Sequence, residues 1–169
     1  MFTGSKIKYV LSTKLGLVTL PNKDVRGVDI LDIMDKYSHN FSYWLYVYRF
    51  RKFKSNDKAG KWMLFIKDGD LPYCMEKLVR GVDNGIFNII KCSVPNQFNP
   101  HYTPGVSAIM VYTEDYENKV EIKKVLDYLL SYGLDFGEEL FYKADYQTRE
   151  GKYEGGRGES WLYSSKDFR

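Results

Sequence analysis

Residues 106–133, VSAIMVYTEDYENKVEIKKVLDYLLSYG, decide the fold because their hydrophobic pattern changes period midway. Residues 106–113 are an apolar run with β-branched and aromatic side chains, which predicts a strand. From residue 118 to 132 apolar side chains recur at helical spacing, and Gly133 follows as a stop signal. The apolar face of this predicted helix consists of Val120, Ile122, Val125, Leu126, Leu129 and Leu130.

Working outward, the same two patterns predict the other elements. Strands are predicted at residues 41–50, 62–66 and 87–92 and from residue 139 onward, and helices at residues 24–37 and 71–84. Turn residues around 56–60 predict that the strands at 41–50 and 62–66 form an antiparallel pair. The alternation predicts an α+β fold with an antiparallel or mixed sheet and its helices on one face. Trp44 and Trp62 have apolar strand neighbours and are expected in the core.

The length of 169 residues predicts one domain over residues 1–169. The net charge is only +3, which argues against a duplex nucleic acid as partner. Positive charge is concentrated in the first part of the chain, above all at residues 49–54, RFRKFK. That run is interpreted as a strand with solvated cations, or alternatively as a surface that attracts an anion.

Cys74 and Cys92 lie among apolar residues and are not spaced as C-x-x-C, so we interpret them as reduced core thiols. This favours a cytoplasmic location. Because neither a signal-peptide pattern nor a long apolar stretch occurs, no membrane partner is expected.

Recognisable catalytic and metal-binding patterns are missing from the sequence. His39 and His101 have no cysteine or carboxylate at metal-ligand spacing, so neither a metal site nor a cofactor is expected. There is no nucleophile-elbow or P-loop motif, and neither histidine is placed by sequence beside a cysteine. Hydrolase chemistry is therefore not supported.

Residues 142–165, YKADYQTREGKYEGGRGESWLYSS, combine aromatic rings, cations, hydroxyls and glycines. This composition suits a phosphorylated ring ligand: the rings can stack on a base, and the cations can donate to phosphate oxygens. The alternative is an irregular, solvated hairpin followed by a tail. The candidate stacking rings are Tyr142, Tyr146, Tyr153 and Trp161, and the candidate phosphate donors are Lys143, Arg149, Lys152 and Arg157.

Six collinear blocks resemble the basophilic-leukaemia-expressed protein family. These are residues 44–48 (WLYVY) and 60–63 (GKWM), Lys91 with Ser93, residues 111–116 (VYTEDY), the motif YKxDxxTxxGxY at residues 142–153, and Arg157 with LYxS at residues 162–165. The chain departs from the family pattern near Arg157, where the family places a Trp directly after the Arg. The resemblance implies the fold of the translation-initiation cap-binding protein, a curved antiparallel sheet with helices on its convex face.

The resemblance also implies functions. Phage members of the family look like anti-CBASS sponges, which bind cyclic dinucleotide signals of bacterial immunity without cleaving them, and bacterial members carry the label phosphothreonine lyase. We therefore expect a non-catalytic viral protein of immune evasion that sequesters a cyclic dinucleotide in the cytoplasm of an infected bacterium. A dimer or tetramer is expected because a symmetric assembly suits a nearly symmetric ligand.

Two alternatives remain open at this point. A lyase would need a lysine base such as Lys61, Lys91 or Lys143, with His39 or His101 as the acid. Binding of a cap-like mononucleotide or an RNA end is the third reading. Lys91, which ends an apolar strand before a Pro-rich loop, is expected to point into a cleft. The predicted ligand-binding residues are Lys91, Tyr142, Lys143, Tyr146, Thr148, Arg149, Tyr153 and Arg157, with none predicted to be catalytic.

Overall fold

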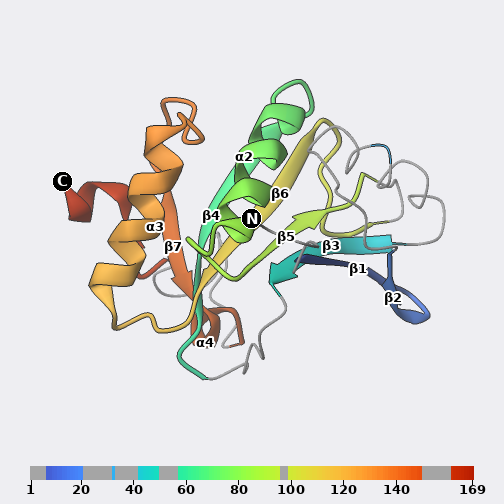
Figure 1. Cartoon of the computed structure of the whole chain (residues 1–169), viewed down its shortest axis with the longest axis horizontal. Helices are drawn as coiled ribbons and strands as arrows, with labels where there is room; N and C mark the ends of the chain where they lie inside the picture. The colour runs from blue at the N-terminus through green and yellow to red at the C-terminus, as the bar shows by residue number, and fades with distance from the viewer. Residues whose placement is uncertain (1–6, 21–31, 33–41, 50–56, 96–98, 150–160) are drawn as a thin grey trace. The chain divides into compact units, whose positions relative to one another are not determined.

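The computed structural model describes residues 7–20, 32, 42–49, 57–95, 99–149 and 161–169 (Figure 1). In chain order the elements are β1 Ile7–Thr13, β2 Gly16–Thr19, β3 Ser42–Arg49, β4 Gly60–Lys67, α2 Leu71–Asp83, β5 Ile89–Ser93, β6 Val106–Thr113, α3 Lys119–Ser131, β7 Phe141–Ala144, α4 Asp145–Arg149, β8 Tyr163–Ser164 and the 3-10 helix η2 Ser165–Phe168. The strands hydrogen-bond in the order β2-β1-β3-β5-β6-β4-β7-β8. The predicted α+β class is confirmed, as are the helices expected at residues 71–84 and 118–132.

The ends of the two long helices coincide with capping and stop residues in the sequence. The Asn118 side chain accepts a hydrogen bond from the Glu121 amide at the start of α3 (3.2 Å), and Gly133 follows the helix with φ +67°. After α2, Gly85 has φ +73° and the Ile86 amide donates to the Gly81 carbonyl, which closes the helix end. These φ angles are costly for a side chain with a Cβ, so glycine fixes both ends.

Contacts divide the chain into two compact units. The first unit comprises residues 1–51 and 65–109, and the second comprises residues 52–64 and 110–169. Strands β4 and β6 each pass from one unit into the other. The single domain expected from the length stays a prediction.

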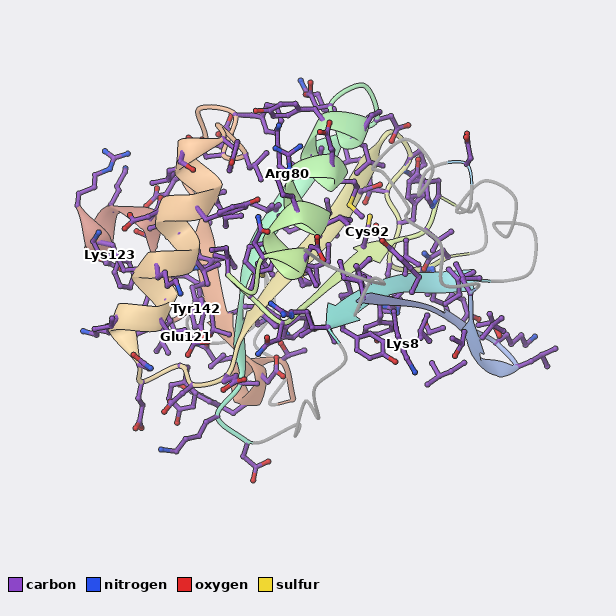
Figure 2. All side chains as sticks on the ribbon, viewed as in Figure 1. Lys8, Arg80, Cys92, Glu121, Lys123 and Tyr142 are labelled. Carbon is purple, nitrogen blue, oxygen red and sulfur yellow. The ribbon has the colours of Figure 1, made fainter. Side chains whose placement is uncertain are left out.

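In the first unit, α2 packs against β3 and β5. Strand alternation turns Leu45 and Val47 of β3 toward the same face as Ile90 and Cys92 of β5, and all four are fully or almost fully buried. Cys92, labelled in Figure 2, is a free thiol, and burial raises its pKa to about 12. The interpretation of the cysteines as reduced core thiols is confirmed.

In the second unit, α3 packs over β4. The Trp62 indole donates to the Ile122 carbonyl (3.1 Å), and Trp62 also meets the Tyr142 ring edge-on at 5.4 Å. The broad apolar face predicted for α3 was partly wrong, because Val120 is 81% exposed. At about 100° per residue, Val120 points nearly opposite to Ile122, so only Ile122, Val125, Leu126 and Leu129 face inward.

The predicted pairing of the strands at 41–50 and 62–66 was wrong. Strand β3 pairs with β1 and β5, whereas β4 pairs with β7. Turn residues between two strands do not determine which strand lies alongside each of them.

The β1–β2 hairpin was missed, although it has a local signal. The Thr13 hydroxyl accepts from the Leu15 amide and donates to the Gly16 carbonyl, and Gly16 has φ +121°. Figure 1 shows this hairpin beside β3. The helix expected at residues 24–37 lies outside the described residues, apart from residue 32.

Candidate functional site

Two lysines face each other across neighbouring strands of the second unit. Lys61 on β4 and Lys143 on β7 are direct register partners, and each is only 6% exposed. The next pair along the ladder, Trp62 and Tyr142, points to the α3 face. Lys61 and Lys143 therefore project from the face of β4 and β7 that α3 does not cover. We call these two residues the lysine pair.

Lys61 is surrounded by groups from two other elements, α4 and β6. Its Nζ lies 2.8 Å from Asp145 Oδ1 and 3.1 Å from Thr148 Oγ1, both on α4. The same ammonium lies 5.7 Å from the centre of the Tyr112 ring on β6. The sequence separation between Lys61 and Asp145 is 84 residues, so only the sheet brings them together.

The short helix α4 is fixed by one backbone hydrogen bond and one side-chain hydrogen bond. The Asp145 amide donates to the Ala59 carbonyl (2.9 Å), next to the start of β4. The Gln147 side chain is buried, and its Oε1 accepts from the Ala144 amide (2.9 Å). These two contacts set the position of the Asp145 and Thr148 side chains relative to Lys61.

The electrostatics of the lysine pair favour an anion. The pKa of Lys143 is lowered from its ordinary value by burial and, secondly, by the positive charge of Lys61. Like charges directly opposite each other on paired strands repel. A phosphate between the two ammonium groups would reduce that repulsion and accept charge-assisted hydrogen bonds.

Aromatic rings flank the lysine pair along the chain on both sides. Tyr146 of α4 meets Tyr116 edge-on at 5.2 Å, and the Tyr163 hydroxyl donates to the Tyr116 carbonyl (3.0 Å). On β7, Phe141 shares the strand face of Lys143 and contacts the half-exposed Trp161 at 4.7 Å. The two ring pairs therefore lie at the two ends of the segment from residue 141 to residue 146.

The structure places the predicted site residues in several surroundings. Lys143, Tyr146 and Thr148 lie together on β7 and α4, and Arg149 is the last residue of α4. Tyr142 is fully buried, and its hydroxyl lies 2.6 Å from Thr113 Oγ1, so it forms part of the α3-facing core. Figure 2 labels it within the second unit. Lys152, Tyr153 and Arg157 lie outside the described residues.

Lys91 belongs to the first unit. It lies on β5, with its Nζ 4.3 Å from the centre of the Trp44 ring. His101, from the loop after β5, stacks on the same indole with ring centres 5.1 Å apart. The expectation that Trp44 is a core residue was wrong, because the alternation of β3 turns it away from the buried face; Trp62 is fully buried as expected.

Sequence reasoning did not predict that Asp145 and Tyr112 lie next to Lys61, and it named Lys61 only as a candidate base. Asp145 and Thr148 did carry a signal, because a spacing of three residues places two side chains on one side of a helical turn. Their partner Lys61 had no such signal. Within the described residues, His, Cys, Asp and Glu side chains nowhere gather in a group that could hold a metal ion. None of the helices in that part of the chain combines the length and apolar character needed to cross a membrane.

Comparison with known proteins gives a family and a fold. The family model described as basophilic leukemia-expressed protein Bles03 matches residues 54–149, a range that contains Lys61, Tyr112, Lys143, Asp145 and Thr148. No curated protein matches the sequence.

Several solved structures are similar. Ascaris suum eIF4E-3 in complex with m2,2,7G cap has a TM-score of 0.60 at 11% identity, covering 98% of this chain and 99% of that one. Schistosome eIF4E complexed with m7GpppA and 4E-BP has a TM-score of 0.63 at 11% identity, covering 94% of each chain. C. elegans eIF4E-3 with the 4E-binding protein Mextli and a cap analog has a TM-score of 0.55 at 12% identity, covering 85% of this chain and 91% of that one. At these identities the similarity establishes an eIF4E-like fold.

Proposed function

We propose, from the premise that this chain belongs to the basophilic leukemia-expressed protein Bles03 family, that it binds and sequesters a nucleotide without consuming it. The ligand we propose first is a cyclic dinucleotide immune signal, which would make the protein an anti-CBASS sponge of a phage. The observation that carries the proposal is the lysine pair, two buried cations that are register partners, in which Lys61 also bonds Asp145 and Thr148. An anionic ligand next to two like charges reduces their mutual repulsion and can accept charge-assisted hydrogen bonds.

The flanking rings support a ligand with two bases. Phe141 with Trp161 and Tyr116 with Tyr146 give two aromatic surfaces at the two ends of the segment that carries Lys143. Stacking contributes about 1–3 kcal/mol per base, and sequestration needs no group poised to react. A cyclic dinucleotide carries two bases and two phosphates, which corresponds to these surfaces and cations. Arg149, Tyr153 and Arg157 remain proposed ligand contacts from the sequence.

A cap-like mononucleotide is the competing ligand within the same proposal. The similar Ascaris and schistosome structures are complexes with m2,2,7G cap and m7GpppA. Both ligand classes bring phosphate to a flat base, so the lysine pair by itself suits either. The dinucleotide is favoured by the presence of two ring pairs rather than one.

Calorimetric titration separates these ligands. Purified protein is titrated with a cyclic dinucleotide panel, the matching linear dinucleotides and a cap analogue, and Lys61→Met and Lys143→Met are titrated in parallel. Each lysine variant should weaken binding roughly ten- to hundred-fold, since a charge-assisted hydrogen bond contributes about 1.5–3 kcal/mol. The matched control is Lys123→Met, because Lys123 is half-exposed on α3 and pairs with Asp127 (Figure 2). Unchanged affinity in both lysine-pair variants would refute this phosphate site.

A second measurement tests sequestration. The protein is saturated with the bound nucleotide, freed of excess ligand, heated to unfold it, and the supernatant is analysed by mass spectrometry. The intact ligand should return in stoichiometric amount. Linear or dephosphorylated products that increase with protein concentration would contradict sequestration and would show that the protein is an enzyme.

The lyase is kept as a second candidate because of one observation. Lys143 has a lowered pKa beside Lys61, which is the way a lysine becomes a general base. The candidate acid His101 belongs to the first unit, and His39 lies outside the described residues. Incubation with a phosphothreonine peptide decides the matter: elimination of phosphate that disappears in Lys143→Met would establish the lyase.

The proposed assembly is a homo-oligomer, a dimer or tetramer, in the host cytoplasm. It is tested by light scattering after size exclusion, with and without the bound nucleotide.

A further inference from the structure

The first unit has a sheet edge that carries exposed apolar side chains. Strand β2, drawn in blue in Figure 1, is the last strand at its end of the sheet, and among the described residues only β1 pairs with it. Leu17 and Val18 of β2 are 74% and 44% exposed, and Leu15 in the adjoining turn is almost completely exposed. We call the strand Gly16–Thr19 together with Leu15 the β2 edge.

The β2 edge lacks the features that usually prevent edge strands from pairing with other chains. Such strands are very short, or they carry lysine, proline or a bulge. The strand at the other end of the sheet follows this rule, because β8 is only two residues long. Residues 15–20, LGLVTL, contain neither a charged residue nor a proline, and the register of β2 with β1 is continuous over the whole strand. The edge is therefore suited to pair with a further strand.

The backbone groups of two residues in β2 point away from β1. The Leu20 amide donates to the Tyr9 carbonyl (2.8 Å), so the backbone groups of Leu20 point toward β1. In an antiparallel ladder, the residues that bond the neighbouring strand alternate along the chain. Val18 therefore also bonds toward β1, whereas Leu17 and Thr19 turn their N–H and C=O groups outward.

These outward groups are complementary to those of a second copy. If two β2 strands lie antiparallel about a two-fold axis at Val18, Leu17 of each copy lies opposite Thr19 of the other. Each of these pairs can then exchange both N–H···O=C hydrogen bonds, as hydrogen-bonded pairs of an antiparallel sheet do. Within the strand, only an axis at Val18 pairs both outward residues of each copy.

The side chains at this axis are apolar. Val18 is the register partner of Leu11, which is 1% exposed, so Val18 lies on the sheet face that carries the core. Across the axis Val18 would meet Val18 of the second copy in a non-hydrogen-bonded pair, in which opposite Cα atoms are about 4.5 Å apart. Leu17 projects from the other face, opposite Thr19 of the second copy. Pairing therefore covers apolar surface on both faces and involves no charged side chain of the strand.

We infer that the β2 edge is a homodimer interface, in which two copies of this chain pair their β2 strands antiparallel about a two-fold axis at Val18. Two-fold contacts of this kind are the commonest in homo-oligomers. The strand is short, whereas stable interfaces bury about 800 Å² per partner, so we expect a concentration-dependent dimer. The inference assigns a surface to the homo-oligomer proposed above and does not depend on the lysine pair or its ligand.

Analytical ultracentrifugation of charge variants tests this interface. The wild type should show a monomer–dimer equilibrium, and Val18→Lys and Val18→Glu should each weaken it roughly five- to tenfold, because the axis places like charges opposite each other. An equimolar mixture of the two variants should form a heterodimer, since residue 18 faces residue 18. The matched control is Val120→Lys, at an exposed valine of the second unit, which should dimerise like the wild type.

Three results of this experiment would overturn the inference. The first is a wild type that stays monomeric at all concentrations. The second is a charge variant that dimerises as strongly as the wild type. The third is a mixture of Val18→Lys and Val18→Glu that associates no better than either variant alone.

Val18→Cys keeps the inference testable if a charge at this position unfolds the hairpin. Opposite Cα atoms about 4.5 Å apart are within the range of a disulfide, so mild oxidation should link two copies of the variant. Cys74 and Cys92 are buried, so the wild type should stay unlinked. Non-reducing electrophoresis measures the linked species, and its absence at concentrations where the wild type dimerises overturns the axis at Val18.

Amide hydrogen exchange, followed by NMR, distinguishes a second copy from another segment of the same chain. The amides of Leu17 and Thr19 should become protected as the dimer forms, whereas the Val18 amide should be protected by β1 at every concentration. Equal protection of Leu17 and Thr19 in a monomer would show that the chain covers its own edge, and it would overturn the inference. Lys143→Met should dimerise like the wild type, so a failure of the nucleotide site and a failure of this interface are separate results.

Discussion

Lys61 and Lys143 are register partners on β4 and β7, and both side chains are almost completely buried. Their positive charges repel each other. The pKa of Lys143 is lowered mainly by burial and, to a smaller extent, by the charge of Lys61. The ion pair from Lys61 to Asp145 and the hydrogen bond to Thr148 keep Lys61 in place. This relationship between two cations is the basis of the proposed anion site and leads to the first two predictions.

Replacement of Lys61 by methionine should raise the pKa of Lys143 toward its ordinary value of 10.5. Methionine keeps most of the volume and removes the charge, so the repulsion ends while the burial remains. The pKa therefore stays somewhat below 10.5, and ¹³C NMR of the lysine Cε signals measures it. Lys58→Met, at an exposed lysine paired with Glu117, serves as the control. A Lys143 titration that is the same in wild type and Lys61→Met would contradict the coupling.

Asp145→Asn should lower stability and raise affinity for the anionic ligand together. The variant breaks the ion pair with Lys61, whose side chain is 8% exposed while that of Asp145 is 30% exposed. A loss of roughly 1–2 kcal/mol is expected, between the values for exposed and buried pairs. Loss of the carboxylate also removes a competitor for the lysine ammonium, so calorimetry should show several-fold tighter binding.

The matched control for Asp145→Asn is Asp127→Asn, which breaks an exposed pair with Lys123 and should cost less than about 1 kcal/mol in urea unfolding. Equal losses in the two variants would show that the Lys61 pair behaves as a surface contact.

Gly60→Ala should be destabilising, whereas Gly69→Ala should not. A Cβ at Gly60 would overlap the Tyr142 hydroxyl and ring, which are fixed in the core, while a Cβ at Gly69 meets no atom within 4 Å. Overpacking of this kind costs about 1–3 kcal/mol. Urea unfolding curves of the two alanine variants measure the difference, and similar stability in both would argue against the close approach of β4 to Tyr142.

The stability of the first unit should depend on pH because of His101. Its folded-state pKa lies below 6.5, so the unfolded chain binds the proton more tightly. The stability that this group contributes is present above about pH 6.5 and is lost as the pH falls through the folded-state pKa. NMR titration of the imidazole signals should show the lowered pKa, and Lys91→Met should raise it because one of its two causes disappears. An unchanged His101 pKa in Lys91→Met would show that the charge of Lys91 does not lower the pKa of His101.

Much of the local structure could be predicted from the sequence. The apolar spacing of α2 and α3 and their stop signals at Gly85 and Gly133 specify these helices, because side chains three and four residues apart share a face within a single segment. Strand β6 was predicted with its observed bounds because residues 106–113 are a short apolar run rich in strand-forming side chains. Helix α4 and strand β8 were beyond such reasoning, since five and two residues are too short to show a period.

The composition of residues 142–165 suits a phosphorylated ring ligand but equally allows a solvated hairpin, so the sequence offered Lys143 and Thr148 only as candidate ligand contacts. What the sequence could not determine is which strands lie side by side. The pairing of β4 with β7 brings Lys61 to Lys143 and Asp145, and the pairing of β3 with β5 brings Trp44 to Lys91. Periodicity encodes which face of a segment is apolar, whereas the choice of neighbouring strand depends on contacts between residues far apart in the chain. The same distinction explains Trp44 and Tyr142, which are both aromatic residues of strands. Only the tertiary structure decided that Tyr142 lies in the buried core and that Trp44 lies on the face of β3 that α2 does not cover.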